Sequence, residues 1–233
     1  MSYSFDGTND YLSGSFTSTY ADPVTLACFV KLTTHPVAVD CFVCLGNSSS
    51  SFDDSYRIET GSTDDAWRAT SRTTGDSQAE ITSLNRDATW TPVVGVFTSN
   101  TLRDLYVAAI GNTAQSTTSR AVADVLQYVR VGEELSGGRD FNGLIAEVAI
   151  WNKALDTSEI TAYLGGTAAS GIAAANLIGY WPLSASNATQ SNLGTDAGGD
   201  LTVTGATYSA DHPTISSSSV AARAAAYYAM LRN

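Results

Sequence analysis

Short apolar runs recur along this chain, and turns rich in Gly, Ser, Asn and Asp separate them. Strands of this length joined by polar turns are typical of an antiparallel sandwich or jelly roll. The runs that we interpret as strands are 24–32, 39–45, 56–60, 66–70, 79–84, 93–97, 102–107, 126–131 and 144–151. The pattern therefore predicts an all-β fold, an antiparallel two-sheet jelly-roll sandwich.

One short helix is expected directly after the last of these strands, over residues 156–164. Asp156 stands three positions before Glu159, which is the spacing of a capping box at a helix N-terminus. Ile160, Tyr163 and Leu164 then follow at helical spacing.

The chain divides into three parts by its pattern, with the jelly roll at 1–165. Residues 166–213 are too few for a core of their own, so we expect an appendage packed on the jelly roll. It holds a strand at 177–183, which Pro182 marks as an edge or terminal strand, and a hairpin at 200–208. The third part, 214–233, is a linker and a C-terminal arm.

The C-terminal arm has strong helix formers after a run of serines that ends at Ser219. A helix this short needs a surface to pack on, either its own domain or another subunit. The second alternative predicts a homo-oligomer or attachment to a larger particle. The interface residues would be Val220, Arg223, Tyr227, Tyr228, Leu231 and Arg232.

Charge and composition narrow the partners. The formal net charge is −11, and an acidic surface repels phosphate backbones and anionic lipid heads, so we expect neither nucleic acid nor membrane partners. No run approaches the roughly 20 apolar residues of a membrane span. No signal peptide is visible before the first strand, which predicts synthesis and folding in the cytoplasm.

Three segments together resemble the laminin-G-like, concanavalin A-like lectin and glucanase jelly roll over residues 3–165. They are the opening Phe5-Asp-Gly-Thr-Asn-Asp-Tyr-Leu12, the late strand and helix from Phe141 to Ile160, and Trp90-Thr-Pro-Val-Val-Gly-Val-Phe97 with Leu105-Tyr-Val107. The turn after Val107 departs from the pattern of the family. The resemblance implies a fold that mostly binds or builds, and that catalyses only in some branches.

Catalytic patterns are missing from the sequence. Glucanase branches of the family present Glu-x-Asp-x-Glu on one strand face, and no such triplet occurs here. The paired acids, such as Glu133-Glu134, are interpreted as solvated turns. His35 and His212 each precede proline and lie beside no recognisable nucleophile. We therefore predict that the protein is not an enzyme.

The resemblance also implies a calcium site, because relatives often bind calcium through Asp, Asn and backbone oxygens. The matching positions are Asp6, Asn9 and Asp10 and the residue before Glu147. Relatives commonly have Asp at that last position, whereas this chain has Ala146. The main prediction is therefore that no cofactor is bound, with calcium as the alternative.

The cysteines are predicted to be buried strand residues. Cys41 and Cys44 are an odd number of residues apart, so on a regular strand they would face opposite sides. That excludes a shared metal and disfavours a redox pair.

Sugar binding requires exposed aromatic rings, and the sequence offers Tyr56, Trp67, Trp90 and Tyr128. Trp90 and Trp151 occupy positions that usually fill the core of the family. Trp67 is therefore the best candidate for a glycan platform, with a core role as its competing interpretation.

Three functions remain open for the chain. The main prediction is a virion structural or interaction protein on the virion surface, such as a phage capsid decoration or tail subunit, whose partners are other virion subunits or its own copies. The alternative is a carbohydrate-binding module or lectin that binds a surface glycan. The third is a glycoside hydrolase, against which the missing acid triplet argues.

Overall fold

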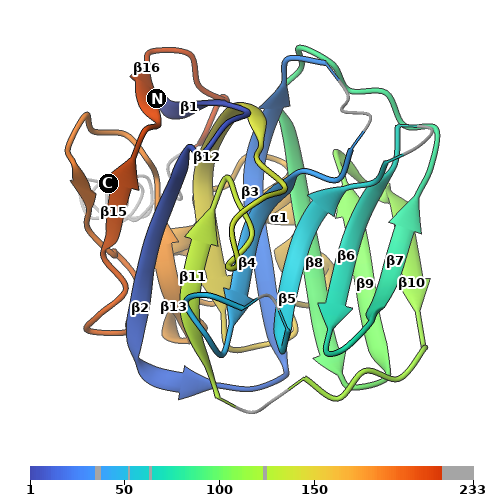
Figure 1. Cartoon of the computed structure of the whole chain (residues 1–233). Helices are drawn as coiled ribbons and strands as arrows, with labels where there is room; N and C mark the ends of the chain where they lie inside the picture. The colour runs from blue at the N-terminus through green and yellow to red at the C-terminus, as the bar shows by residue number, and fades with distance from the viewer. Residues whose placement is uncertain (35–37, 52, 63–64, 123–124, 217–233) are drawn as a thin grey trace, which may run out of the picture.

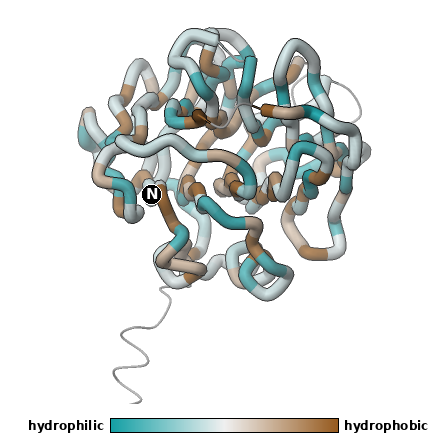
Figure 2. The backbone as a smooth tube through the Cα atoms, turned by 90° about the horizontal axis from the view of Figure 1, so that it is seen from below, coloured by the Kyte–Doolittle hydropathy of each residue, from teal (hydrophilic) through white to brown (hydrophobic). Residues whose placement is uncertain are grey.

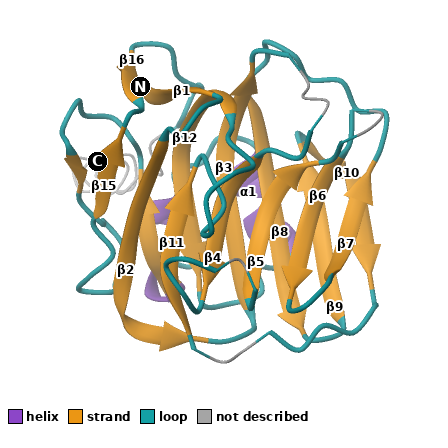
Figure 3. Ribbon diagram, viewed as in Figure 1, coloured by secondary structure: helices purple, strands orange, loops and turns teal. Residues whose placement is uncertain are grey.

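The computed structural model describes residues 1–34, 38–51, 53–62, 65–122 and 125–216. In this part of the chain, the strands form two antiparallel eight-stranded sheets that face each other, as the sequence predicted (Figure 1). Figure 3 shows the short helix behind the rear sheet and the long loops at the two ends of the sandwich. Among the described residues, no helix is long and apolar enough to cross a membrane.

The first sheet, sheet A, has the strand order β10-β9-β8-β3-β12-β1-β16, and β13 also pairs with β12. Its strands are β1 (Ser2–Asp6), β3 (Val24–Leu32), β8 (Thr91–Ser99), β9 (Leu102–Val107), β10 (Ala109–Ser116), β12 (Asn142–Trp151), β13 (Leu177–Trp181) and β16 (Thr207–Ser209).

The second sheet, sheet B, has the order β14-β15-β2-β11-β4-β5-β6-β7. Its strands are β2 (Tyr11–Tyr20), β4 (Cys41–Gly46), β5 (Ser55–Thr60), β6 (Trp67–Arg72), β7 (Asp76–Ile81), β11 (Leu126–Val131), β14 (Thr189–Gln190) and β15 (Leu201–Thr204).

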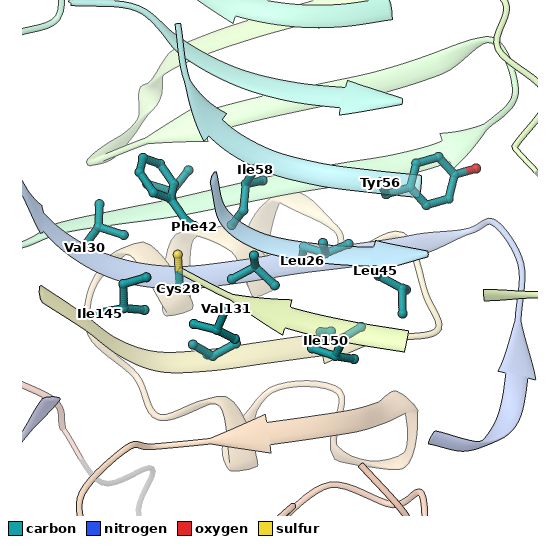
Figure 4. Packing of buried hydrophobic residues seen from close by; sticks show 14 of the residues in the cluster. Leu26, Cys28, Val30, Phe42, Leu45, Tyr56, Ile58, Val131, Ile145 and Ile150 are labelled. Carbon is teal, nitrogen blue, oxygen red and sulfur yellow. The ribbon is translucent and has the colours of Figure 1, made fainter. Parts of the chain in front are cut away.

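The main core fills the space between the two sheets, because alternate residues of every strand point inward. Figure 4 shows inward-facing side chains of both sheets interdigitating, among them Leu26, Cys28 and Val30 of β3 against Phe42 of β4 and Ile58 of β5. All five are buried. Figure 2 shows hydrophobic and hydrophilic stretches following one another along the backbone.

A second apolar cluster lies on the other side of sheet A, where helix α1 (Thr157–Leu164) covers the strands. The helix begins as predicted: the Asp156 side chain accepts from the Ser158 and Glu159 amides, and Glu159 accepts from the Asp156 amide. Tyr163 of the helix packs edge-on against Trp151, which is fully buried. Two short 3-10 turns, η1 (Ala169–Gly171) and η2 (Ala174–Asn176), lead from the helix to β13.

Residues 166–213 differ from the appendage that the sequence predicted. Their strands extend both sheets: β13 pairs with β12, β15 with β2 and β16 with β1. The predicted hairpin at 200–208 is absent, since β15 and β16 belong to different sheets and the chain crosses between them at Gly205. The strand at 177–183 is an edge strand that ends before Pro182, as predicted.

Candidate functional site

The outer face of sheet B, which points away from the core, carries a row of polar side chains across six strands. Paired registers align Ser13, Arg130, Cys44, Arg57, Thr70 and Gln78 in that order. A sheet face of this kind is normally solvated. Here, however, Cys44, Arg57 and Thr70 are fully buried.

A network of ion pairs accounts for the burial of Arg57. Its guanidinium lies 3.1 Å from Glu59 Oε2, 3.1 Å from Asp76 Oδ1 and 3.5 Å from Glu134 Oε2. Arg139 adds contacts of 2.9 Å to Glu59 and 3.1 Å to Glu134. Buried charges are costly unless they are paired, and each of these groups has an ion-pair partner of opposite charge.

The pKa values follow from the same contacts. Burial would lower the pKa of Arg57, but Glu59 and the neighbouring thiols and Asp76 together hold it above its ordinary value. Burial raises the pKa of Asp76, but Arg72 and Arg57 outweigh that effect and bring it below the ordinary value. For Glu134, burial dominates and raises the pKa despite Arg139.

The loop between β11 and β12 seals the middle of this face. In Figure 1 it runs, in yellow, back across the front of the sheet. It places Glu134 on Arg57 and Leu135 on Cys41 and Cys44. The sequence interpretation of Glu133-Glu134 as a solvated turn was wrong, because both side chains are buried. A turn pattern cannot show that a loop will fold back onto a charged sheet.

The interpretation of the two cysteines as lying on opposite faces was also wrong. A β-bulge between Cys41 and Val43 adds one residue to β4 and shifts its alternation. Both thiols consequently point to the outer face, where they contact each other under Leu135.

Beside the loop, toward β2, the outer face opens into a depression of about 220 Å³ lined by Ser13, Gly14, Ser15, Ser49, Tyr128, Val129, Arg130 and Leu135. Arg130 is held in place: it lies 4.5 Å from the centre of the Tyr11 ring and donates to Glu133 at 2.7 Å and to the Ser49 carbonyl at 3.4 Å. Tyr128 is half-buried and packs on the cysteine cluster. The depression thus combines a fixed aromatic ring, a fixed guanidinium and serine hydroxyls.

The predicted aromatic candidates divide in the structure. The prediction that Trp67 is an exposed glycan platform was wrong. Its side chain is fully buried on the inner face of β6, and its Nε1 donates a hydrogen bond to the Leu84 carbonyl at 2.8 Å. Tyr56 is buried in the same core. Trp90 and Tyr128 are both half-buried. Sequence alternation around residues 66–70 could not decide which face of β6 points inward.

Trp90 lines a separate cavity of about 480 Å³ on the other side of the molecule, with Phe29, Arg86, Pro92, Leu164, His212 and Pro213 among its walls. Its indole Nε1 donates to Asp211 at 2.9 Å, and Asp211 also pairs with Lys31 at 2.6 Å. This cavity is the second place where an aromatic ring could meet a ligand.

The three predicted calcium ligands lie together near Asp140: Asp6 ends β1, and Asn9 and Asp10 belong to the loop between β1 and β2. The Asp10 carboxylate accepts from the Asp6 amide at 2.9 Å, and Asp140 accepts from the Asn9 amide at 3.1 Å. Burial raises the pKa of Asp10. Among the residues that the structure describes, no group of three or more His, Cys, Asp or Glu side chains is arranged to hold a metal ion.

Ala146, which the resemblance placed at the same calcium site, lies elsewhere. Ser4 and Asp6 of β1 pair with Leu144 and Asn142 of β12, so Ala146 lies further along β12 from this loop. Its side chain is buried in the cluster under α1. The missing carboxylate at position 146 therefore has no bearing on Asp6, Asn9 and Asp10.

The predicted arm residues from Val220 to Arg232 lie outside the described residues.

Near the same loop, burial raises the pKa of Asp40 to about 6, and the nearby Asp140 adds to this shift while a hydrogen bond from the Asn142 amide opposes it. A carboxyl group with a raised folded pKa stabilises the protein in its protonated form. Stability should therefore fall as pH rises from about 4 to about 6.

We expect Asp40→Asn to remove that loss and to raise the free energy of unfolding at pH 7.5 by about 1–3 kcal/mol. Urea unfolding of the wild type and D40N at pH 4.5 and 7.5 measures the difference in the free energy of unfolding. The control is Asp104→Asn, because Asp104 is only half-buried on β9. An equal effect of D40N at both pH values would contradict this account.

Comparison with known proteins assigns the fold to a superfamily. The family model described as the concanavalin A-like lectin/glucanases superfamily matches residues 6–161. No curated protein sequence matches the chain.

Three solved structures illustrate the likeness. A candidate carbohydrate-binding protein from Bacteroides ovatus aligns with a TM-score of 0.63 and 16% identity, over 92% of this chain and 61% of its own. A heptameric SAP-like pentraxin from Limulus polyphemus aligns with a TM-score of 0.52 and 15% identity, over 70% of this chain and 81% of its own. The CBM40 of a Ruminococcus gnavus IT-sialidase, bound to α2,3-sialyllactose, aligns with a TM-score of 0.52 and 13% identity, over 70% of this chain and 95% of its own. At these identities the likeness shows the fold alone.

Proposed function

The chain belongs to the concanavalin A-like lectin/glucanase superfamily, and within it we propose that this protein is a non-catalytic carbohydrate-binding protein. The proposed glycan site is the depression beside Tyr128 on the outer face of sheet B. The observation that carries the proposal is the fixed pair of Tyr128 and Arg130, which stand among serine hydroxyls in a surface hollow.

Each part of the depression matches what a sugar ring needs. An aromatic side chain offers an apolar surface to the C–H face of the ring, and its placement is set by packing. Arg130 and the serine side chains supply hydrogen bonds for hydroxyl groups. Because its contacts to Tyr11 and Glu133 hold the Arg130 guanidinium, little side-chain freedom is lost on binding.

The size of the depression sets the expected ligand. Its volume of about 220 Å³ lies below the ~300–1,000 Å³ of most small-molecule pockets. This favours a single sugar residue at the end or on the side of a longer glycan, bound weakly through a small contact area.

The charge network argues for binding rather than hydrolysis. A glycosidase needs a carboxylic acid and a carboxylate placed on either side of one glycosidic bond. Glu59, Asp76 and Glu134 share a sheet face, but each is ion-paired with arginine and the first is fully buried. The neighbours whose descriptions name carbohydrate binding also favour this function over catalysis.

The main prediction from the sequence, a virion surface subunit, finds no support in these comparisons. Its basis in the sequence included the C-terminal arm, whose residues 217–233 lie outside the described residues. The virion location, homo-oligomer formation and attachment to other subunits therefore stay predictions. Carbohydrate binding, the alternative from the sequence, is the better-supported function.

A glycan array screen of the full chain, followed by calorimetry with the best glycan, tests the proposal. We expect binding, and we expect Tyr128→Ala to weaken it at least tenfold. Tyr208→Ala is the matched control, because Tyr208 is 38% exposed on the edge strand β16 of the other sheet. It should leave binding unchanged.

The Trp90 cavity is the alternative location, and Trp90→Ala distinguishes the two. Loss of binding in W90A with full binding in Y128A would move the site to that cavity. Failure of the wild-type chain to bind any glycan on the array would contradict carbohydrate binding itself.

A further inference from the structure

Cys41 and Cys44 form a thiol pair whose surroundings set it apart from a pair of buried apolar residues. The bulge in β4 aligns Cys41 with Glu59 and Cys44 with Arg57 on the neighbouring strand β5. Both are fully buried, unbridged and packed under Leu135. The Cys41 thiol donates a hydrogen bond to the Cys44 sulfur.

Cys44 occupies a site built for a negative sulfur atom. Besides Cys41, the Leu135 amide and the Ser55 hydroxyl donate to it, and the Arg57 guanidinium lies close enough to act on it electrostatically. Burial alone would raise the pKa of the Cys44 thiol, but these donors and Arg57 bring it below the ordinary value. The pKa of Cys41 is raised well above it, mainly by burial. Within the pair, Cys44 is therefore the thiol that gives up its proton more readily.

Cys28 provides an internal comparison within the same chain. It is as deeply buried, but it points into the apolar core among Leu26, Val30 and Phe42 (Figure 4). Burial raises the pKa of its thiol well above the ordinary value. The second thiol and the guanidinium beside it, rather than burial, thus distinguish Cys44 from Cys28. Such neighbours favour the thiolate, which is the reactive form of cysteine.

We propose that Cys41 and Cys44 are a redox-active dithiol site, in which Cys44 is the nucleophile toward a peroxide and Cys41 is the resolving thiol. The Cys44 sulfur attacks one oxygen of hydrogen peroxide, the O–O bond breaks, and the other oxygen leaves as hydroxide, which takes up a proton to become water. The product on Cys44 is a sulfenic acid.

The second step closes the disulfide. The Cys41 sulfur attacks the Cys44 sulfur, the S–O bond breaks, and the hydroxyl group leaves with the Cys41 proton as a second water. In sum, two thiols and one hydrogen peroxide give one disulfide and two waters, with the peroxide as the two-electron oxidant.

A short path connects the pair to solvent. Leu135 covers both thiols and also lines the depression beside Tyr128. Leu135 is therefore in contact with both the thiols and the surface depression, and displacement of this side chain is the route by which a molecule as small as hydrogen peroxide would reach the sulfur atoms.

The test treats the folded full chain with increasing hydrogen peroxide, stops the reaction with acid, alkylates the remaining thiols and identifies the cysteine peptides by mass spectrometry. We expect a Cys41–Cys44 disulfide within one chain, while Cys28 remains a thiol that is alkylated only after unfolding. Cys41→Ser should accumulate a sulfenic acid on Cys44, which dimedone traps. Cys44→Ser should form neither the disulfide nor the sulfenic acid. Cys28→Ser should form the Cys41–Cys44 disulfide as the wild type does.

The wild-type result decides the proposal even where a variant folds poorly. Cys41 and Cys44 remaining reduced at peroxide concentrations that oxidise Cys28, or all three reacting at the same rate, would overturn it. A sulfenic acid on Cys41 rather than on Cys44 would overturn the assignment of the nucleophile.

Discussion

Replacing Arg57 by Met is expected to lower the free energy of unfolding by about 3–5 kcal/mol, because it leaves buried carboxylates without their cation. Glu59 is fully buried and Glu134 nearly so, and both contact the Arg57 guanidinium. The aliphatic part of Met fills much of the space, so the loss comes mainly from the charge. Urea or thermal unfolding measures it.

The matched control is Arg68→Met on the next strand. Arg68 pairs with Glu80 on the same outer face, but Glu80 is exposed. Such pairs contribute about 0–1 kcal/mol. The double variant R57M with Glu59→Gln should recover part of the loss, since it removes the stranded charge together with its partner. Equal effects of R57M and R68M would show that the network is solvated.

The second large effect is expected at Asp196, which fixes the loop between β14 and β15 to β2. Its carboxylate accepts from the Thr17 amide at 2.9 Å, the Ser18 amide at 3.2 Å, the Tyr20 hydroxyl at 2.7 Å and the Gly198 amide at 2.8 Å. Asp196→Ala leaves these donors without their acceptor and should cost about 2–4 kcal/mol. Asp200→Ala, which removes one bond to the Asn192 amide, should cost about 1 kcal/mol.

The effect of Asp196 should depend on pH with a defined sign. Burial would raise the pKa of this carboxyl, but the hydrogen bonds from Tyr20, Thr17 and Gly198 bring it far below the ordinary value. Its contribution to stability is therefore fully present above the unfolded pKa of about 4, and it is lost as pH falls below that value. The gap between wild type and D196A should narrow from pH 6 to pH 2.5. A gap that widens toward acid pH would contradict the assignment.

The sequence predicted most of the fold because alternation and capping are local signals. The bounds of β3, β9 and β11 agree with the prediction, and α1 begins directly after its predicted N-cap. The strand β2 was not among the predicted runs, because Ser, Thr and Gly dominate its length and give no apolar alternation. The edge strand β10 is uncharged and exposed, so it shows no amphipathic pattern.

The site was harder to predict, because its parts depend on contacts between distant segments. The burial of Glu134 follows from a loop that folds back onto β5, and the shared face of Cys41 and Cys44 follows from a bulge. Neither has a signature in one sequence. Tyr128 alternates with Val129 and Val131 on β11, so its outward direction could have been inferred once the inner face was known.

The same limits explain the failure of Trp67 as a glycan platform. Trp67 and its neighbour Arg68 point to opposite faces of β6, and the sequence pattern alone did not show which of the two faces the core. An arginine at this position can remain on the outer face by pairing with Glu80, whereas the tryptophan gains more by filling the space beside Phe42.

The central claim is that the glycan site lies on the outer face of sheet B beside Tyr128. Backbone amide chemical shifts of the ¹⁵N-labelled chain, followed while the best glycan from the array is added, test it most directly. The largest shifts are expected at Ser13, Ser15, Ser49, Tyr128 and Arg130, and the amides around the Trp90 cavity should not shift. Shifts centred on Trp90, Gly165 and His212, with Tyr128 and Arg130 unmoved, would contradict it.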